Sequence, residues 1–296
     1  MILNASTLEA IQLGFQAIFY DALKGANPIW PKVAMRTASN SKTEVYPWLG
    51  AAPVMEEWLD ERSLANIKAY KWTIENKDWA NGIEVDRNDI QDDKIGIYNP
   101  MVQSLGYAAA IHPDKLIFQD LLLNGFSTTC YDGQYFFDTD HPRMDGLSVQ
   151  SNKHSLTLTA DNYATVRATM MALTDDRGNP LGVMPNLLVV PPQLEQTALE
   201  IVKADRNSSG ATNVLKGSAD VLVAPYLASQ PTWWFLLDTT KPVKPFILQV
   251  RQEAQIVSQT NPDSDNVFMR KKFRYGADWR GAAAYGLWQF AAGSQG

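Results

Sequence analysis

The stretch from Thr129 to Pro142 contains the side chains best suited to chemistry. Asp138, Asp140 and His141 are three possible metal ligands within four residues. Carboxylate oxygens and imidazole nitrogens bind divalent cations, usually with further ligands from elsewhere in the chain. The simpler interpretation is a turn, because Asp side chains bond to local backbone and Pro142 stops the segment. We therefore expect a turn here, with no metal, no other cofactor and no catalytic residue.

Sequence motifs that commonly mark catalytic sites are missing. The chain has three histidines (His112, His141 and His154) and one cysteine, Cys130, and they form no HExxH, CxxC or similarly spaced set. No GxSxG elbow, GxGxxG motif or phosphate-binding loop is present either. Many active sites have no local signature, so a metal-dependent hydrolase that uses Asp138, Asp140 and His141 stays open as an alternative.

The composition is that of an acidic chain with a large core. Its 296 residues are 45% hydrophobic and carry a net charge of -6, enough to bury one or two domains. A chain this acidic is not suited to gripping a polyanion over its whole surface. A single cysteine excludes a disulfide framework and indicates assembly in a reducing cytoplasm. The first residues do not resemble a secretory signal, and no apolar run reaches the roughly 18 residues that span a bilayer.

The N-terminal part is predicted to be a helix followed by extended chain. Residues 6–24 have an apolar side at helical spacing, with Ser6 as a candidate N-cap and Glu9 at the capping-box position. About fifty residues then consist mostly of extended segments with exposed aromatic side chains, and Asn81-Gly82 is a turn signal among them. This region is either a β-rich subdomain or an arm that packs on a neighbouring molecule, and the residues alone leave both open.

The strongest helical pattern covers residues 99–124. Asn99 is a candidate N-cap, and Pro100 stands at the first helical position, where its missing N–H costs nothing. Pro113 falls in the middle and predicts a kink or a brief interruption. Beyond this helix, residues 160–228 alternate helix and strand like a compact α/β unit, and the remaining residues are rich in strands.

A basic cluster at residues 270–274 lies next to aromatic residues. Arg270, Lys271, Lys272 and Arg274 could bind nucleic acid by charge and stacking. The same pattern fits a strand with one solvated face, which we favour. We accordingly expect weak, sequence-independent contact with double-stranded DNA.

Several of these segments together resemble the major head subunit of Mu-type phages, the gpT family. Neither the block at 73–93 nor the block at 130–142 would suffice alone, but the two are specific in combination, and the similar segments cover most of the chain. They are Tyr46–Gly50, Glu56–Trp58, Thr73–Lys77, Val85–Asp93, Cys130–Pro142, Phe273–Gly276 and Gly286–Gln289.

The resemblance implies an α+β protein with the Hong-Kong-97-type phage capsid fold. Such a fold has an N-terminal arm, an extended hairpin loop, a peripheral domain with a long spine helix, and an axial α/β domain. The order of elements expected from the residues alone is the same. The implied division is an arm at 1–36, a loop at 37–84, a peripheral domain at 85–159 and 229–296 with its spine helix at about 99–124, and an axial domain at 160–228.

The function implied is that of a major capsid protein. It would self-assemble as hexamers and pentamers into an icosahedral shell around phage double-stranded DNA, in the host bacterial cytoplasm, and remain in the virion. Scaffold, portal and decoration proteins are the other expected partners, and no membrane is involved. An encapsulin-like compartment that packages protein cargo is the alternative within the same fold.

The extended loop is the expected site of contact between subunits. Its aromatic side chains have few apolar residues nearby to bury them, and large interfaces are rich in such anchors. Trp48, Trp58, Arg62 and Trp72 are the residues we expect at this contact. Some proteins of the wider fold cross-link through a loop lysine, but nothing marks Lys68, Lys71 or Lys77 as reactive, so we do not predict cross-linking.

Overall fold

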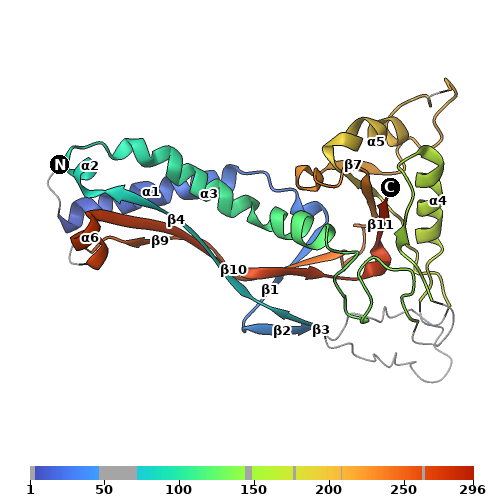
Figure 1. Cartoon of the computed structure of the whole chain (residues 1–296), viewed down its shortest axis with the longest axis horizontal. Coiled ribbons are helices and arrows are strands. Elements are labelled where there is room, and N and C mark those ends of the chain that lie inside the picture. Colours follow the sequence, from blue (N-terminus) through green and yellow to red (C-terminus); the bar gives the residue numbers. More distant parts are fainter. Residues whose placement is uncertain (1–3, 47–71, 144–148, 176–177, 208, 262–263) are drawn as a thin grey trace, which may run out of the picture.

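The computed structural model describes residues 4–46, 72–143, 149–175, 178–207, 209–261 and 264–296. Figure 1 shows an elongated molecule with two parts. A long arm of helices and strands extends to one side, and a second lobe, which contains the C-terminus, stands at its other end. Each part is built around its own β-sheet.

The arm contains a four-stranded sheet in the order β1-β9-β10-β4. Its two long central strands, β9 (Phe246–Gln259) and β10 (Lys272–Tyr285), are antiparallel. The outer strand β4 (Lys77–Asp86) is antiparallel to β10, whereas β1 (Ala34–Ala38) runs parallel to β9. Side chains of β10 alternate between buried and more exposed positions, so one face of this sheet is covered.

Two helices, α1 (Ala5–Gly25) and α3 (Asn99–Asp114), lie together along one face of the arm sheet (Figure 1). The helix expected over residues 6–24 is thus confirmed as α1. Its N-cap is Asn4 rather than Ser6, because the Asn4 side chain accepts a hydrogen bond from the Thr7 N–H at 2.8 Å.

The long helix predicted at 99–124 is present, and it changes character near its proline. α3 ends at Asp114, and the chain continues directly as η3 (Lys115–Leu122), whose turns are the wider turns of a π-helix. Pro113 has no N–H to give to the preceding turn, so the interruption expected there is confirmed. Asn99 is not the N-cap; it is the first residue of the helix.

Asp114 ties this break to the chain that follows α1. Its carboxylate accepts hydrogen bonds from the N–H of Trp30 at 2.7 Å and of Ile29 at 3.0 Å. Burial raises the pKa of Asp114 above its ordinary value, and the two backbone N–H groups oppose this only in part. The N-terminal segment is therefore hydrogen-bonded to the spine at the residue where the α-helix ends and the π-helix begins.

His112 is packed between two indole rings on the side of the spine that faces the sheet. Its ring centroid lies 4.5 Å from that of Trp79 and 5.4 Å from that of Trp279. Its Nε2 is buried and has no hydrogen-bond partner within the described parts of the chain. Burial, helped by the charge of Lys115, lowers the pKa of His112 below its ordinary value.

We expect His112→Phe to make the subunit less sensitive to acid. Below about pH 6.5 the unfolded chain takes up a proton at this position before the folded chain does, so the wild type loses stability as the pH falls. Phenylalanine fills the space between the indoles and cannot titrate. Urea unfolding from about pH 8 to about pH 5 should show a smaller loss for the variant. Equal losses in both proteins would contradict this role for His112.

The second lobe contains a five-stranded sheet in the order β5-β11-β8-β6-β7. Its strands are β5 (Lys153–His154), β11 (Ala291–Gln295), β8 (Trp233–Leu237), β6 (Leu187–Val190) and β7 (Asp220–Val223). The alternation of helix and strand expected over residues 160–228, and the strands expected beyond it, are thus confirmed. Because β8 and β11 follow residue 228 and pair within this sheet, the sheet crosses the boundary predicted there between axial and peripheral domains.

Two helices accompany this sheet, and shorter elements complete the chain. Most core residues of the lobe belong to one hydrophobic cluster, which continues into the spine through Ile117 and Phe118. The helices are α4 (Ala160–Met171) and α5 (Glu195–Val202), and the other elements are β2 (Thr43–Tyr46), β3 (Trp72–Glu75), α2 (Arg87–Gln91), α6 (Asp265–Arg270), η1 (Trp30–Lys32), η2 (Ile95–Tyr98), η4 (Pro192–Leu194), η5 (Pro225–Leu227) and η6 (Trp288–Phe290).

Two further local predictions differ from the structure. Asn81-Gly82 forms no turn, because β4 passes through it and Gly82 pairs directly with Gly276 of β10. The basic cluster is a strand only from Lys272 onward. Arg270 ends α6, and Lys271 has a left-handed backbone that separates α6 from β10.

Candidate functional site

His141 is at the centre of a buried polar cluster in the loop that was expected to be a turn. Its side chain and that of Asp132 are 0% and 2% exposed, and His141 Nδ1 lies 2.7 Å from Asp132 Oδ2. On the other side of the ring, Nε2 lies 3.1 Å from Asn152 Oδ1. The Cys130 thiol donates a hydrogen bond to the second Asp132 oxygen at 3.1 Å.

Asn152 connects this loop to the end of the chain. Its Nδ2 donates to the carbonyl oxygens of Phe136 at 2.8 Å, Ala291 at 3.0 Å and Trp288 at 3.3 Å. Its Oδ1 also accepts the Asp138 N–H at 2.9 Å. One buried side chain thereby joins three segments that are distant in the sequence.

The local fold of the loop follows from its residue types. Gly133 takes a left-handed conformation with φ 89°, and the Cys130 N–H closes the turn by donating to the Gln134 carbonyl at 2.8 Å. Phe136 and Phe137 are fully buried and anchor the loop in the main core. The His141 and Gln150 backbones exchange two hydrogen bonds of 3.0 Å, which hold the far side of the loop.

The electrostatics of the cluster do not favour a reactive thiol. Burial and the nearby Asp132 carboxylate strongly raise the pKa of Cys130, so the group stays a neutral thiol and a poor nucleophile. Burial alone would raise the pKa of Asp132, but the hydrogen bond and charge of His141 outweigh it and the net shift is downward. Asp132 is thus an ionised carboxylate at neutral pH, although it is buried.

The structure does not bring the three suspected ligands together. Asp138 binds local backbone, accepting the N–H groups of Thr139 at 2.8 Å and Tyr135 at 3.2 Å, and Asp140 is exposed. His141 instead meets Cys130 and Asp132, with potential ligand atoms within 4.8 Å of one another. Sequence reasoning missed this grouping, although all three residues belong to the stretch it singled out.

Hydrogen bonds within the protein already use the polar atoms of this cluster, so we expect it to hold no metal. Protein washed with a chelator should keep its unfolding midpoint, and elemental analysis should find no stoichiometric zinc or manganese. His141→Gln provides the matched control. Stoichiometric metal in the wild type that disappears in this variant would contradict the prediction.

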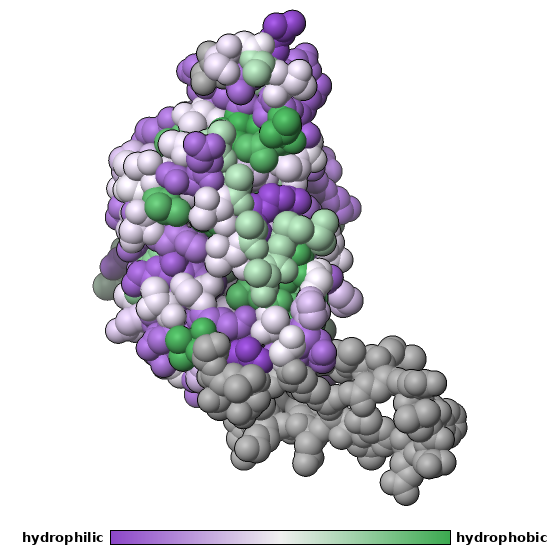
Figure 2. Space-filling view, turned by 90° about the vertical axis from the view of Figure 1, so that its right-hand side faces the viewer, coloured by the Kyte–Doolittle hydropathy of each residue, from purple (hydrophilic) through white to green (hydrophobic). Residues whose placement is uncertain are grey.

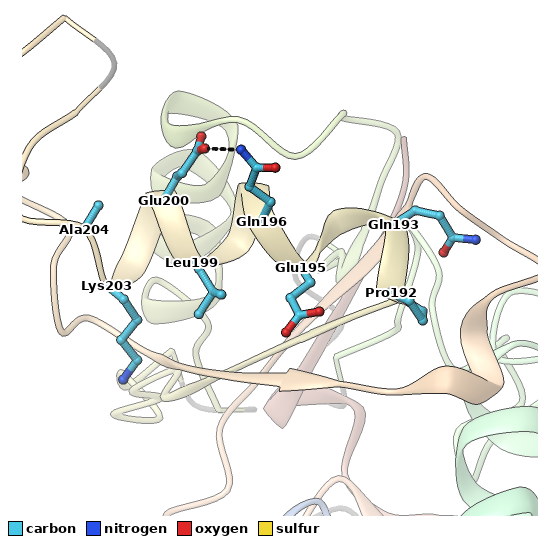
Figure 3. Close-up of a pocket in the computed structure, with 8 residues that line it drawn as sticks. All are labelled: Pro192, Gln193, Glu195, Gln196, Leu199, Glu200, Lys203 and Ala204. Atoms are coloured by element: carbon cyan, nitrogen blue, oxygen red, sulfur yellow. Dashed lines mark hydrogen bonds between the residues drawn. The ribbon is translucent and has the colours of Figure 1, made fainter.

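A hollow on α5 offers no catalytic set. It is lined by Pro192, Gln193, Glu195, Gln196, Leu199, Glu200, Lys203 and Ala204. Figure 3 shows Glu195, Leu199 and Lys203 on one side of the helix, whereas Gln196 and Glu200 bond to each other on the other side at 2.8 Å. Lys203 is already paired with Asp220 at 2.6 Å.

The expected subunit contacts are only partly covered by the structure. Trp48, Trp58 and Arg62 lie outside the described residues. Trp72 is the first residue of β3, opposite Tyr46 in β2, and its half-buried ring packs against the main core of its own chain. Contact of these residues with a neighbouring subunit stays a prediction.

The basic cluster is partly neutralised within the chain. Lys272 Nζ lies 3.0 Å from one Glu84 carboxylate oxygen, and Arg274 Nε lies 3.2 Å from the other. These pairs hold the pKa of Glu84 below its ordinary value. Two of the four cations in the cluster therefore face an acid on the neighbouring strand β4.

The surface at the α4 and α5 end is mixed in character. Figure 2 shows hydrophilic residues over much of this end, with several separate apolar patches among them. The large apolar residues that are exposed on its elements and loops include Met171, Met184, Leu199 and Val214. None of the described helices is long and apolar enough to span a membrane.

A family model described as the Mu-like prophage major head subunit gpT matches residues 8–156, 147–227 and 228–296. The chain belongs to this family. It is 32% identical over 287 residues to the Mu-like prophage FluMu major head subunit of Haemophilus influenzae, covering 96% of this chain and 71% of that protein. It is 30% identical over 296 residues to the major capsid protein of Escherichia phage Mu, covering 100% of this chain and 76% of the relative.

Solved capsid structures support the same assignment. The chain matches the procapsid of bacteriophage JBD30 with a TM-score of 0.65 and 29% identity, over 99% of this chain and 76% of that one. A virus-like particle from Pyrococcus furiosus matches with a TM-score of 0.55 at 10% identity, over 95% of this chain and 97% of the other, and shares the fold alone. The subunit therefore has the Hong-Kong-97-type capsid fold, and it is a major capsid protein of the Mu-like type, a structural protein of the virion shell.

Proposed function

We propose that the subunit assembles with copies of itself into hexamers and pentamers, which close an icosahedral shell around double-stranded phage DNA. Assembly takes place in the cytoplasm of the host bacterium, with scaffold and portal proteins as partners. The observation that carries the proposal is the match to the JBD30 procapsid over nearly the whole chain. A related JBD30 capsid is described as decorated with minor capsid protein trimers, which supports a decoration protein as a further partner.

The parts of the subunit take the roles that this fold assigns. The arm sheet, α1 and the spine formed by α3 and η3 make the peripheral domain and N-terminal arm, and the five-stranded lobe makes the axial domain. The five-stranded sheet also contains β8 and β11, which lie in the range 229–296 that the resemblance assigns to the peripheral domain. The extended loop, expected over residues 37–84, carries Trp48, Trp58, Arg62 and Trp72 at the contact with a neighbour.

Imaging the expressed protein tests this function. The full chain, produced alone or with its phage scaffold, should elute as capsomers or large particles, and negative staining should show closed shells. A small soluble oligomer under both conditions would contradict the proposal. Particles that hold protein cargo and no DNA when produced during phage growth would instead favour an encapsulin-like compartment.

Contact with the enclosed DNA is weak and independent of sequence. The acidic balance of the chain and the pairing of Lys272 and Arg274 with Glu84 support this. Few phosphates can then be neutralised, so affinity should be low and fall steeply with salt. Mobility shifts of short duplexes at rising salt measure this directly. Tight binding at physiological salt would indicate a role in DNA processing.

A further inference from the structure

Both ring nitrogens of His141 face hydrogen-bond acceptors. Nδ1 faces Asp132 Oδ2, and Nε2 faces Asn152 Oδ1. The orientation of the Asn152 amide is fixed, because its Nδ2 faces three carbonyl oxygens and the Asp138 N–H donates to its Oδ1. A neutral imidazole carries one N–H, so it would leave one of the two acceptors facing a lone pair.

The surroundings of the ring favour a cation. Asp132 also accepts hydrogen bonds from the Gln134 N–H at 3.1 Å and from the Cys130 thiol, as expected of an ionised carboxylate. The His141 ring is stacked on the indole of Trp288, with centroids 3.9 Å apart and planes at 8°. An aromatic face is a favourable neighbour for a desolvated positive charge.

This cluster lies on the joint between the two sheets. β10 of the arm sheet ends at Tyr285, and β11 of the second sheet begins at Ala291. The connector between them contains Trp288, which stacks on His141. The carbonyl oxygens of Trp288 and of Ala291, the first residue of β11, accept hydrogen bonds from Asn152. Just beyond it, the Gly293 N–H donates to the Asn152 carbonyl at 3.0 Å.

We propose that His141 is held as an imidazolium and acts as a proton-dependent clasp. The clasp is the hydrogen-bonded set Asp132, His141 and Asn152, and it holds the joint, residues 286–290, between the arm sheet and the five-stranded sheet. When its proton passes to solvent, one ring nitrogen becomes an acceptor that faces another acceptor, and the hold on the connector weakens. The clasp then opens at alkaline pH, and the arm gains freedom to change its angle to the second lobe. This inference concerns a joint within one subunit, so it stands apart from the shell geometry proposed above.

Other titratable groups near the ring are few. The loop itself carries Cys130, Tyr131, Asp132, Tyr135, Asp138 and Asp140 and is followed by Arg143, and the segment that contains Asn152 continues into Lys153 and His154. The connector, residues 286–290, contains no ionisable side chain. Cys130 stays a thiol and Asp132 a carboxylate across the neutral range, because the pKa of the first is raised and that of the second lowered. The proposal therefore rests on the two acceptors that face the His141 ring.

Cys130 is the single cysteine of the chain and reports whether the clasp is open. Unassembled full-length subunits are reacted with the thiol reagent DTNB at several pH values, and each rate is divided by that of the urea-unfolded chain at the same pH. We expect the protection of Cys130 to fall by at least about tenfold between neutral and alkaline pH, as the loss of a charged hydrogen bond implies. Protection that is independent of pH would overturn the proposal.

Asp132→Asn is the decisive variant. An amide at this position can donate to Nδ1, so a neutral His141 satisfies every partner and the protection should no longer depend on pH. His154→Gln is the control and should behave like the wild type. A fall in Asp132→Asn as large as in the wild type would overturn the proposal. If Asp132→Asn fails to fold, nitrogen NMR of His141 in the wild type decides: both ring nitrogens protonated at mildly alkaline pH supports the clasp, and one bare nitrogen refutes it.

Discussion

Asn152→Leu is expected to destabilise the subunit by about 4 kcal/mol, because several buried polar groups lose their partners at once. The carbonyls of Phe136, Trp288 and Ala291 lose a donor, and the Asp138 N–H and His141 Nε2 lose an acceptor. Leucine has nearly the same size, so the loss measures hydrogen bonding rather than volume. Urea unfolding monitored by tryptophan fluorescence gives the free energy of unfolding directly.

Asn162→Leu is the matched control. Asn162 is near the start of α4, where its Nδ2 donates to the Thr157 carbonyl at 2.9 Å in a solvent-exposed position. Water can replace this bond, so we expect a loss below about 1 kcal/mol. If the two leucine variants have the same stability, the Asn152 network does not hold the joint together.

Gly106→Ala is expected to cost about 3 kcal/mol, because α1 and α3 cross at this glycine. A Cβ there would collide with the carbonyl oxygen of Phe19 and come within 3.1 Å of the Ala22 side chain. The colliding atom is backbone of a packed helix, so relief requires the two helices to separate. The expected result is a lower urea midpoint and looser packing of α1.

Gly14→Ala makes the same chemical change on α1 without the collision. Gly14 is exposed, and an added Cβ would meet nothing within 4 Å. Alanine is the better helix former, so this variant should gain up to about 1 kcal/mol. Opposite signs for the two substitutions would confirm that Gly106 is required by close packing. A neutral Gly106→Ala would show that the helices are not so close in solution.

The elements that sequence predicted well are those set by local chemistry. Apolar spacing and Pro100 placed the spine helix, and Pro113 placed its interruption, because a missing N–H acts on the adjacent turn whatever surrounds it. The turn predicted at Asn81-Gly82 is wrong for the opposite reason. Pairing with β10 over ten residues holds that dipeptide in a strand, and tertiary contacts override the turn preference.

The candidate site could be located from sequence, but its partners could not. Clustered acids and a histidine identified the stretch, yet the neighbours of His141 are Asp132 and Asn152, nine residues before it and eleven after it. Which side chains face the ring depends on how the loop folds on itself and on the arrival of Trp288 from the far end of the chain. No spacing rule contains that information.

The order of strands in the arm sheet has a consequence for how fast the subunit folds. Its central strands β9 and β10 are neighbours in sequence and can pair early, whereas the outer strands β1 and β4 come from the first third of the chain. Pairing the outer strands with the central ones requires long segments of chain to close into loops first, which is slow. Until then the edges of the central strands are unpaired and prone to aggregation. We therefore expect refolding in two kinetic phases, of which the slower one reports the pairing of β1 and β4 with the central strands. The yield of folded subunit should depend on how well aggregation is prevented before that pairing is complete.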